Sequence, residues 1–287
     1  MKTLPQIEFA NAADAKAILT DLAAQMRAGS IVPYLGPGLA ELSRPEAPMT
    51  PEALADFFAS KVALPRWARG NAWASAQYVE SNKHRSTVTA LMVQAFSLPA
   101  DPTPLHHHLA SLPLPIIVDS WYDGAMRTAL GKRSGWGEVQ GITRSGSHDD
   151  RWYRFYDSAG QEVDHALAAH WSTVLYKPHG SVVPAKNFLV TDADYVEVLT
   201  EIDIQTPIPD MVKERRAGRS FLFIGCRFND QLMRIYARQI TKRSAGVHYA
   251  IVDPQVLSGN ELCFLVEQRL TPLAMTLPHA MEILLAK

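Results

Sequence analysis

Five short segments carry residue types that could bind or transform a ligand. They are Gly36-Pro37-Gly38, Asp119-Ser120-Trp121, Lys177-Pro178-His179-Gly180, Gly225-Cys226-Arg227 and Asp253. Each follows a short run of apolar and β-branched residues, which predicts that each lies at the end of a β-strand. Glycines let backbone N–H groups approach a pyrophosphate, a carboxylate can accept from ribose hydroxyls, and a histidine can act as a general base near neutral pH. One such segment alone says little, but five in this order predict a shared ligand site.

The elements that position these segments alternate between strands and helices. We expect strands at 31–35, 114–118, 173–176, 221–224 and 247–252, and helices at 12–28, 52–61, 104–109, 122–130 and 230–240, with two further helices in 72–97. This alternation predicts an α/β fold, a Rossmann-like, mainly parallel sheet with helices on both faces. Ligands bind such a sheet at the carboxyl ends of its strands, where the five segments fall.

The length of 287 residues predicts a single domain over 1–287. Within it we expect a helical subdomain at about 45–112, where helical segments follow one another, and a small β-rich insert at 131–170, where glycines separate aromatic pieces.

Composition narrows the function classes. Hydrophobic residues make up 47% of the chain, so it can bury a sizeable core. The 28 basic residues are balanced by 29 acidic ones, which disfavours a general nucleic-acid binder. With only Cys226 and Cys263, the chain can form neither a disulfide framework nor a four-cysteine zinc ribbon. The N-terminus lacks a secretory signal and no stretch is apolar enough to span a membrane, so we expect a cytoplasmic protein with reduced thiols.

The order of the five segments resembles the sirtuin-like (silent information regulator 2-like) superfamily, and most closely its bacterial, zinc-free, NAD-hydrolase or defence-type branch. The resemblance covers about residues 12–253. Residues 36–40 (GPGLA) look like the family's first glycine loop, 116–123 (IIVDSWYD) its T-T-N-Y-D region and 176–181 (YKPHGS) the K-L-H-G-S segment with the catalytic histidine, while 189–195 (LVTDADY) and 223–230 (FIGCRFND) are similar to its T-x-x-D-Y and G-Y-S-F-x-D segments.

The resemblance implies NAD as the ligand, no metal, and cleavage of the nicotinamide–ribose bond through an oxocarbenium-like state. It implies His179 as the base, with Asp123 as a second catalytic residue. The nucleotide contacts that it implies are Gly36, Gly38, Ser120, Trp121, Gly225, Arg227 and Asp253.

Three departures from the family pattern keep alternatives open. Trp121 stands where the family has its catalytic asparagine, Ala40 where the first loop ends in serine, and Arg227 where a serine contacts the nucleotide. An indole cannot replace the amide's paired donor and acceptor, whereas an arginine can pair with a phosphate, including a 2′-phosphate. We therefore expect a NAD glycohydrolase that uses His179, and we keep as the alternative a catalytically impaired sensor or scaffold that binds NAD or ADP-ribose. NAD-dependent protein deacylation ranks last because the zinc module is missing, and a homo-oligomer is compatible with the chain's size and aromatic content.

Two further signals are set aside. The run His106-His107-His108 cannot converge on one metal ion, because consecutive helical residues point about 100° apart; His106 resembles a recurring family position at the pocket's edge. Cys226 adjoins the expected pocket, but nothing near it in the sequence would activate a thiolate.

Overall fold

The computed structural model describes residues 12–40, 42, 47–96, 101–144, 151–201, 208–242 and 244–286. The expected subdomain and insert each contain residues outside these ranges, as does the N-terminal segment 1–11. The strands are β1 (Ile31–Leu35), β2 (Ile116–Asp119), β3 (Trp136–Gly141), β4 (Tyr153–Asp157), β5 (Glu162–Val163), β6 (Thr173–Lys177), β7 (Gly180–Ser181), β8 (Asn187–Phe188), β9 (Ser220–Ile224), β10 (His248–Val252) and β11 (Leu270–Ala274). The helices are α1 (Ala12–Arg27), α2 (Pro37–Ala40), α3 (Pro51–Lys61), α4 (Ala72–Lys83), α5 (Arg85–Ala95), α6 (Pro104–Ser111), α7 (Ala125–Leu130), α8 (His165–Ala168), α9 (Asp192–Glu201), α10 (Asp210–Arg216), α11 (Gln231–Thr241), α12 (Gly259–Glu267) and α13 (Leu277–Leu285).

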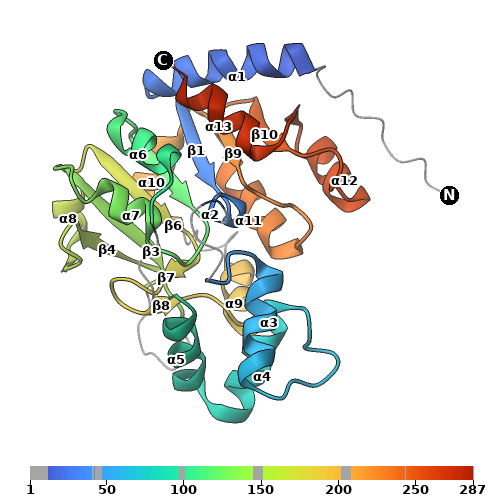
Figure 1. The fold of residues 1–287 in the computed structure, drawn as a ribbon. Coiled ribbons are helices and arrows are strands. Elements are labelled where there is room, and N and C mark those ends of the chain that lie inside the picture. The colour runs from blue at the N-terminus through green and yellow to red at the C-terminus, as the bar shows by residue number, and fades with distance from the viewer. Residues whose placement is uncertain are drawn as a thin grey trace.

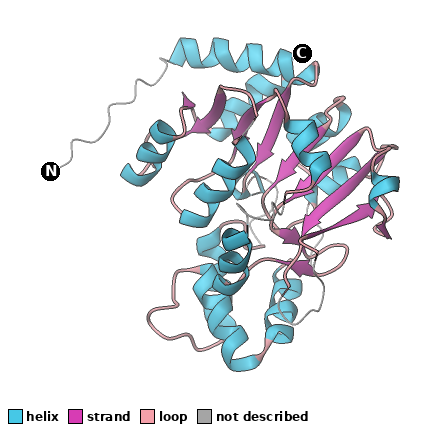
Figure 2. Ribbon diagram, turned by 180° about the vertical axis from the view of Figure 1, so that it is seen from behind, coloured by secondary structure: helices cyan, strands magenta, loops and turns pink. Residues whose placement is uncertain are grey.

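In the described part of the chain, nine strands form one twisted sheet in the order β11-β10-β9-β1-β2-β6-β3-β4-β5 (Figures 1 and 2). The strands from β11 to β3 run parallel to one another, and β4 and β5 continue the sheet in antiparallel fashion. The strands within 131–170 therefore extend the main sheet. The strands that follow β1 in the chain, β2, β3 and β6, lie on one side of it, and the later strands β9, β10 and β11 lie on the other. The side of addition thus reverses at β1, and the ends of strands at such a point form a crevice of the kind that binds ligands.

Helices cover both faces of the sheet, as the side chains of β1 illustrate, because they point alternately to one face and to the other. Ile31 and Leu35 point to a core shared with α1, α6, α7 and α13, and Val32 and Tyr34 point to a core shared with α8, α10, α11 and α12. All five residues of β1 are buried, because both of its faces are covered. This two-sided cover confirms the predicted fold class.

Helices α3, α4 and α5 lie together beyond the carboxyl ends of the central strands (Figure 1). Thr50 caps α3 by accepting from the Ala53 N–H, and Asn71 caps α4 by accepting from the Ala74 N–H. Their apolar faces form a third core, which also takes in Trp121 and Tyr122 from the loop after β2. The helical group is therefore joined to the sheet through the segment that carries the predicted site residues.

Most predicted elements are present with small shifts at their ends. The prediction of a helix from Tyr122 is wrong, because α7 begins at Ala125, after a turn in which the carboxylates of Asp119 and Asp123 accept backbone N–H bonds. Pro33 is accommodated because β1 pairs with β2 only from Tyr34 onward, while its other edge pairs fully with β9. Of the helices that the structure describes, none has the length and apolarity that a membrane crossing requires.

Candidate functional site

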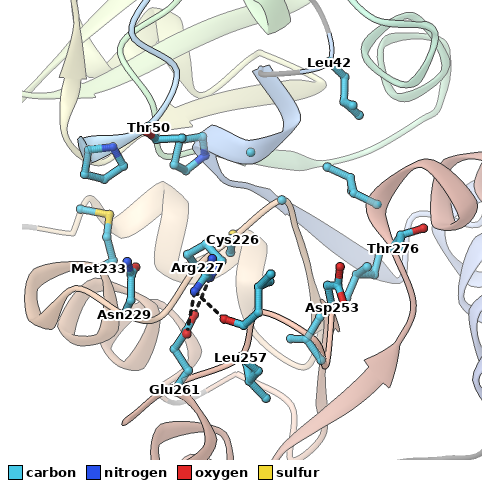
Figure 3. A pocket seen from close by; sticks show the side chains of 18 of the residues that line it. Leu42, Thr50, Cys226, Arg227, Asn229, Met233, Asp253, Leu257, Glu261 and Thr276 are labelled. Atoms are coloured by element: carbon cyan, nitrogen blue, oxygen red, sulfur yellow. Dashed lines mark hydrogen bonds and ion pairs between the residues drawn. The ribbon is translucent and has the colours of Figure 1, made fainter. Parts of the chain in front are cut away.

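A pocket of about 510 Å³ opens at the carboxyl ends of β1, β9, β10 and β11 (Figure 3). Pro37 and Gly38 line it from the end of β1, and the loop after β9 contributes Gly225 to Arg227. Asp253 and Thr276 come from the ends of β10 and β11, and Thr50 to Glu52 close one side from the start of α3. The pocket therefore occupies the crevice that the sheet topology predicts for a ligand.

The glycines in this pocket allow two loops to touch backbone to backbone. The Gly36 N–H donates to Ile224 O at 2.8 Å, and the Gly38 N–H donates to Gly225 O at 2.9 Å. A Cβ atom on Gly36 would lie 2.4 Å from Gly225 O, and Gly225 itself has φ +67°. These glycines are thus needed for loop packing, and the N–H groups of Gly36 and Gly38 are already used within the fold.

Arg227 is held against the pocket wall by a buried carboxylate. Its Nε and Nη2 atoms donate to the two carboxylate oxygens of Glu261 at 2.7 and 2.9 Å, and Nη2 also donates to Val256 O at 3.0 Å (Figure 3). Burial would raise the pKa of Glu261, but bonds from Arg227 and Ser258 lower it to about 2. Glu261 is therefore charged at neutral pH and forms a bidentate ion pair with Arg227.

Trp121 lies in the protein core, away from the pocket lining. Its side chain is 1% exposed, packs against Phe96 and Tyr122, and donates from Nε1 to Pro48 O at 3.2 Å. Since the ring is enclosed by these neighbours, it offers no open face on which a nucleotide ring could stack.

His179 is buried and packs against the aromatic rings of Tyr195 and Tyr236. It is 1% exposed, its ring centroid is 4.3 Å from that of Tyr236, and its Nδ1 lies 3.3 Å from the Tyr195 hydroxyl. Among the described residues, no group forms a hydrogen bond with His179 Nε2 or with the Tyr236 hydroxyl. Burial, and after it the Lys177 ammonium, lower the pKa of His179 to about 3, so the imidazole is neutral at physiological pH.

A buried ion pair fixes the loop between Trp121 and Asp123. Lys177 Nζ donates to Asp119 Oδ2 at 2.7 Å and to Asp123 O at 2.9 Å, and the Trp121 N–H donates to Asp119 Oδ1 at 3.1 Å. Burial raises the pKa of Asp119 to about 6 despite the adjacent Lys177 ammonium. Burial alone would lower the pKa of Lys177, but the carboxylates of Asp119, Asp123 and Glu138 raise it. Lys177 therefore connects β6 to the loop that follows β2.

Two further candidate residues have partners within the fold. The Ser120 hydroxyl donates to Leu35 O at 2.8 Å, and the Asp123 carboxylate accepts from the Ala125 N–H at 2.8 Å. His106 is the third residue of α6, where its Nδ1 accepts from the Thr103 N–H in a capping box. Burial lowers the pKa of His106 to about 4, so this histidine too is neutral at pH 7.

The predicted site residues thus divide into two regions. Gly38, Gly225, Arg227 and Asp253 line the open pocket, with Gly36 packed behind it, whereas Ser120, Trp121, Asp123 and His179 are buried and outside the lining of that pocket. Sequence reasoning missed Glu261, although Ser258-x-x-Glu261 is a recognisable capping-box pattern at a helix start. Among the described residues, no group of three His, Cys, Asp or Glu side chains is arranged to hold a metal ion.

Comparison with known proteins gives a family for the fold. The family model of the SIR2-like domain matches residues 115–273, which run from the start of β2 into β11 and include the Trp121 loop, His179, Arg227 and Asp253. No curated protein matches the chain. Because the family model covers more than half of the sequence, the chain belongs to the SIR2-like domain family, which relates it to NAD.

Proposed function

We propose that the protein binds NAD or an ADP-ribose-type nucleotide in the pocket at the ends of β1, β9, β10 and β11, and that it holds the nucleotide without cleaving it. The observation that carries this proposal is the position of Trp121. The indole stands in the place of the family's catalytic asparagine and belongs to the core that joins the helical group to the sheet.

The shape and lining of the pocket support nucleotide binding. A volume of about 510 Å³ is within the range of small-molecule sites, which are commonly about 300–1,000 Å³. Val256, Leu257 and Leu277 supply apolar surface of the kind that packs against an adenine ring, and the Asp253 carboxylate at the end of β10 can accept from ribose hydroxyls.

The buried region supports retention over cleavage. A general base works best when its pKa lies near the operating pH, and the pKa of His179 is about 3. The side chain is also enclosed by Tyr195 and Tyr236, so a ribose hydroxyl cannot reach it in this conformation.

Isothermal calorimetry with NAD and with ADP-ribose, combined with chromatographic detection of nicotinamide, tests the proposal. We expect binding of at least one of the two nucleotides and no nicotinamide release. The same two measurements are made on Trp121→Asn, which restores the family residue and removes most of the indole volume. Trp67→Ala is the control variant, because Trp67 is 65% exposed. If neither nucleotide binds, the proposal fails.

A second candidate function, NAD hydrolysis, rests on the unpartnered Nε2 of His179. Buried polar atoms without partners are uncommon in folded proteins, and a catalytic role is one explanation for them. This candidate requires nicotinamide release by the unaltered protein, and loss of that release in His179→Ala. Release that persists in His179→Ala would exclude His179 as the base.

A further inference from the structure

Among the residues that the structure describes, the charged side chains that line the pocket are Glu52, Asp253, Glu261 and Arg227, three carboxylates and one guanidinium. An arginine at the end of a strand in such a pocket is commonly a ligand for the 2′-phosphate of NADP, and a carboxylate is commonly the acceptor for the free 2′-hydroxyl of NAD. The residue types alone therefore leave the choice between the two cofactors open.

The contacts of Glu261 determine whether the guanidinium of Arg227 can pair with a phosphate of the ligand. Glu261 is 1% exposed and accepts from the Phe228 N–H at 3.0 Å, from the Ser258 N–H at 2.9 Å and from the Ser258 hydroxyl at 2.8 Å, besides its two bonds from Arg227. The carboxylate is therefore fixed by the start of α12 and by the loop after β9, and it cannot turn away to release the guanidinium. Arg227 is half-exposed, but its Nε and one of its terminal nitrogens point to Glu261.

A phosphate on the 2′-oxygen would add about −1.5 to −2 charges at pH 7. It would enter a pocket where Glu261 neutralises the guanidinium of Arg227 and where the other charged lining residues in the described part of the chain, Asp253 and Glu52, are both acidic. A free 2′-hydroxyl brings no charge and can donate to Asp253. The pocket lining thus favours a ribose without an additional phosphate.

From these contacts we infer that Glu261 is the residue that sets ligand selectivity, because by holding Arg227 it makes the pocket select nucleotides with a free ribose 2′-hydroxyl and reject those with a 2′-phosphate. This inference rests on the proposed nucleotide binding. It adds to that proposal the residue that sets selectivity, the ligand that is preferred and the contact that causes the preference.

Calorimetric titration of NAD and NADP into the unaltered protein gives the first test. We expect NAD to bind at least about tenfold more tightly than NADP. Equal affinities, or a preference for NADP, would overturn the inference and leave the proposed nucleotide binding intact. If neither nucleotide binds, the proposed function and this inference fall together.

Glu261→Gln gives the second test, because glutamine keeps the shape of the side chain and removes its charge. Loss of the neutralising charge beside Arg227 should raise the affinity for NADP relative to that for NAD about tenfold, and adding Arg227→Met to this variant should abolish the gain. Glu282→Gln is the matched control, because Glu282 is exposed on α13. A folded Glu261→Gln protein with the original ratio of affinities would overturn the inference. If the variant does not fold, the affinity ratio of the unaltered protein decides.

Discussion

The two regions that hold the expected site residues differ in how their polar groups are used. In the pocket, Asp253 and Arg227 are partly exposed, and each can be approached from the cavity. In the buried region, Trp121, Lys177 and His179 are about 1% exposed, and the residues around them are aromatic or charged and packed together. The contrast separates the residues that line an open pocket from the residues that the family resemblance implies for bond cleavage, which are part of the core.

The largest effect should come from the ion pair under the Trp121 loop. Lys177→Met removes the partner of a buried carboxylate, and breaking such a pair costs about 3–5 kcal/mol. Urea denaturation at pH 8 measures the change in the free energy of unfolding. Lys213→Met is the matched control, because the Lys213–Asp210 pair is solvent-exposed and its loss should cost no more than about 0.5 kcal/mol. A Lys177 variant as stable as the unaltered protein would show that the buried region is not held by this pair.

Trp121→Ala should have the next largest effect. Truncating a buried tryptophan leaves a cavity and costs about 3 kcal/mol. Because Trp121 does not line the pocket, nucleotide affinity should change much less than the free energy of unfolding. Calorimetry beside thermal unfolding measures both quantities on the same preparation. A large loss of affinity in a folded Trp121→Ala protein would mean that the two regions form one site.

Sequence patterns were sufficient for the parts of the fold that depend on local chemistry. Apolar runs and caps located the central strands β1, β2, β6, β9 and β10 and the helices α1, α3, α4, α5, α6 and α11, but not β11, α12 or α13. The glycine loops were correctly expected at strand ends, and the structure adds that their glycines allow two loops to pack closely. The alternation of strands and helices also indicated a mainly parallel sheet with helices on both faces, but not the order of its strands.

The division of the site could not be predicted from the sequence, because it depends on tertiary packing. Trp121 adjoins Asp119 and Ser120 in the chain, yet its ring is drawn into the core of α3, α4 and α5, which come from a distant segment. Likewise, Arg227 has no sequence signal that pairs it with Glu261, 34 residues later, although the pair determines which charge Arg227 can offer a ligand.

Acid should destabilise the buried region before it affects the pocket. His179 has a pKa of about 3 in the folded protein and about 6.5 in the unfolded chain, so its contribution to stability is complete above pH 6.5 and falls as pH decreases toward 3. At pH 5 this amounts to about 2 kcal/mol. Glu261, with a folded pKa of about 2, loses its contribution only below about pH 4.5.

His179→Gln removes this titration. The difference in the free energy of unfolding between pH 7 and pH 5 should therefore be about 2 kcal/mol smaller in the variant than in the unaltered protein. Asp119 and His106 titrate in both proteins, so they cancel in the comparison. His279→Gln is the control, because His279 is exposed on α13. Equal pH dependence in the two proteins would show that His179 is accessible to protons, and hence that the buried region opens readily.

The smallest predicted effect concerns the loops that form the pocket. A methyl group on Gly38 would lie 2.9 Å from Gly225 O, so Gly38→Ala must push the two loops apart by a few tenths of an ångström. We expect a loss of about 1 kcal/mol in stability. Gly124→Ala is the matched control, because in the described structure no heavy atom outside its chain neighbours lies within 4 Å of the added carbon and its φ is −108°. Because the new methyl group would point at Gly225 and not into the cavity, the pocket should keep its nucleotide while the loops around it are strained. A Gly38→Ala protein of normal stability that no longer binds would indicate instead that the N–H groups of this loop move to meet the ligand.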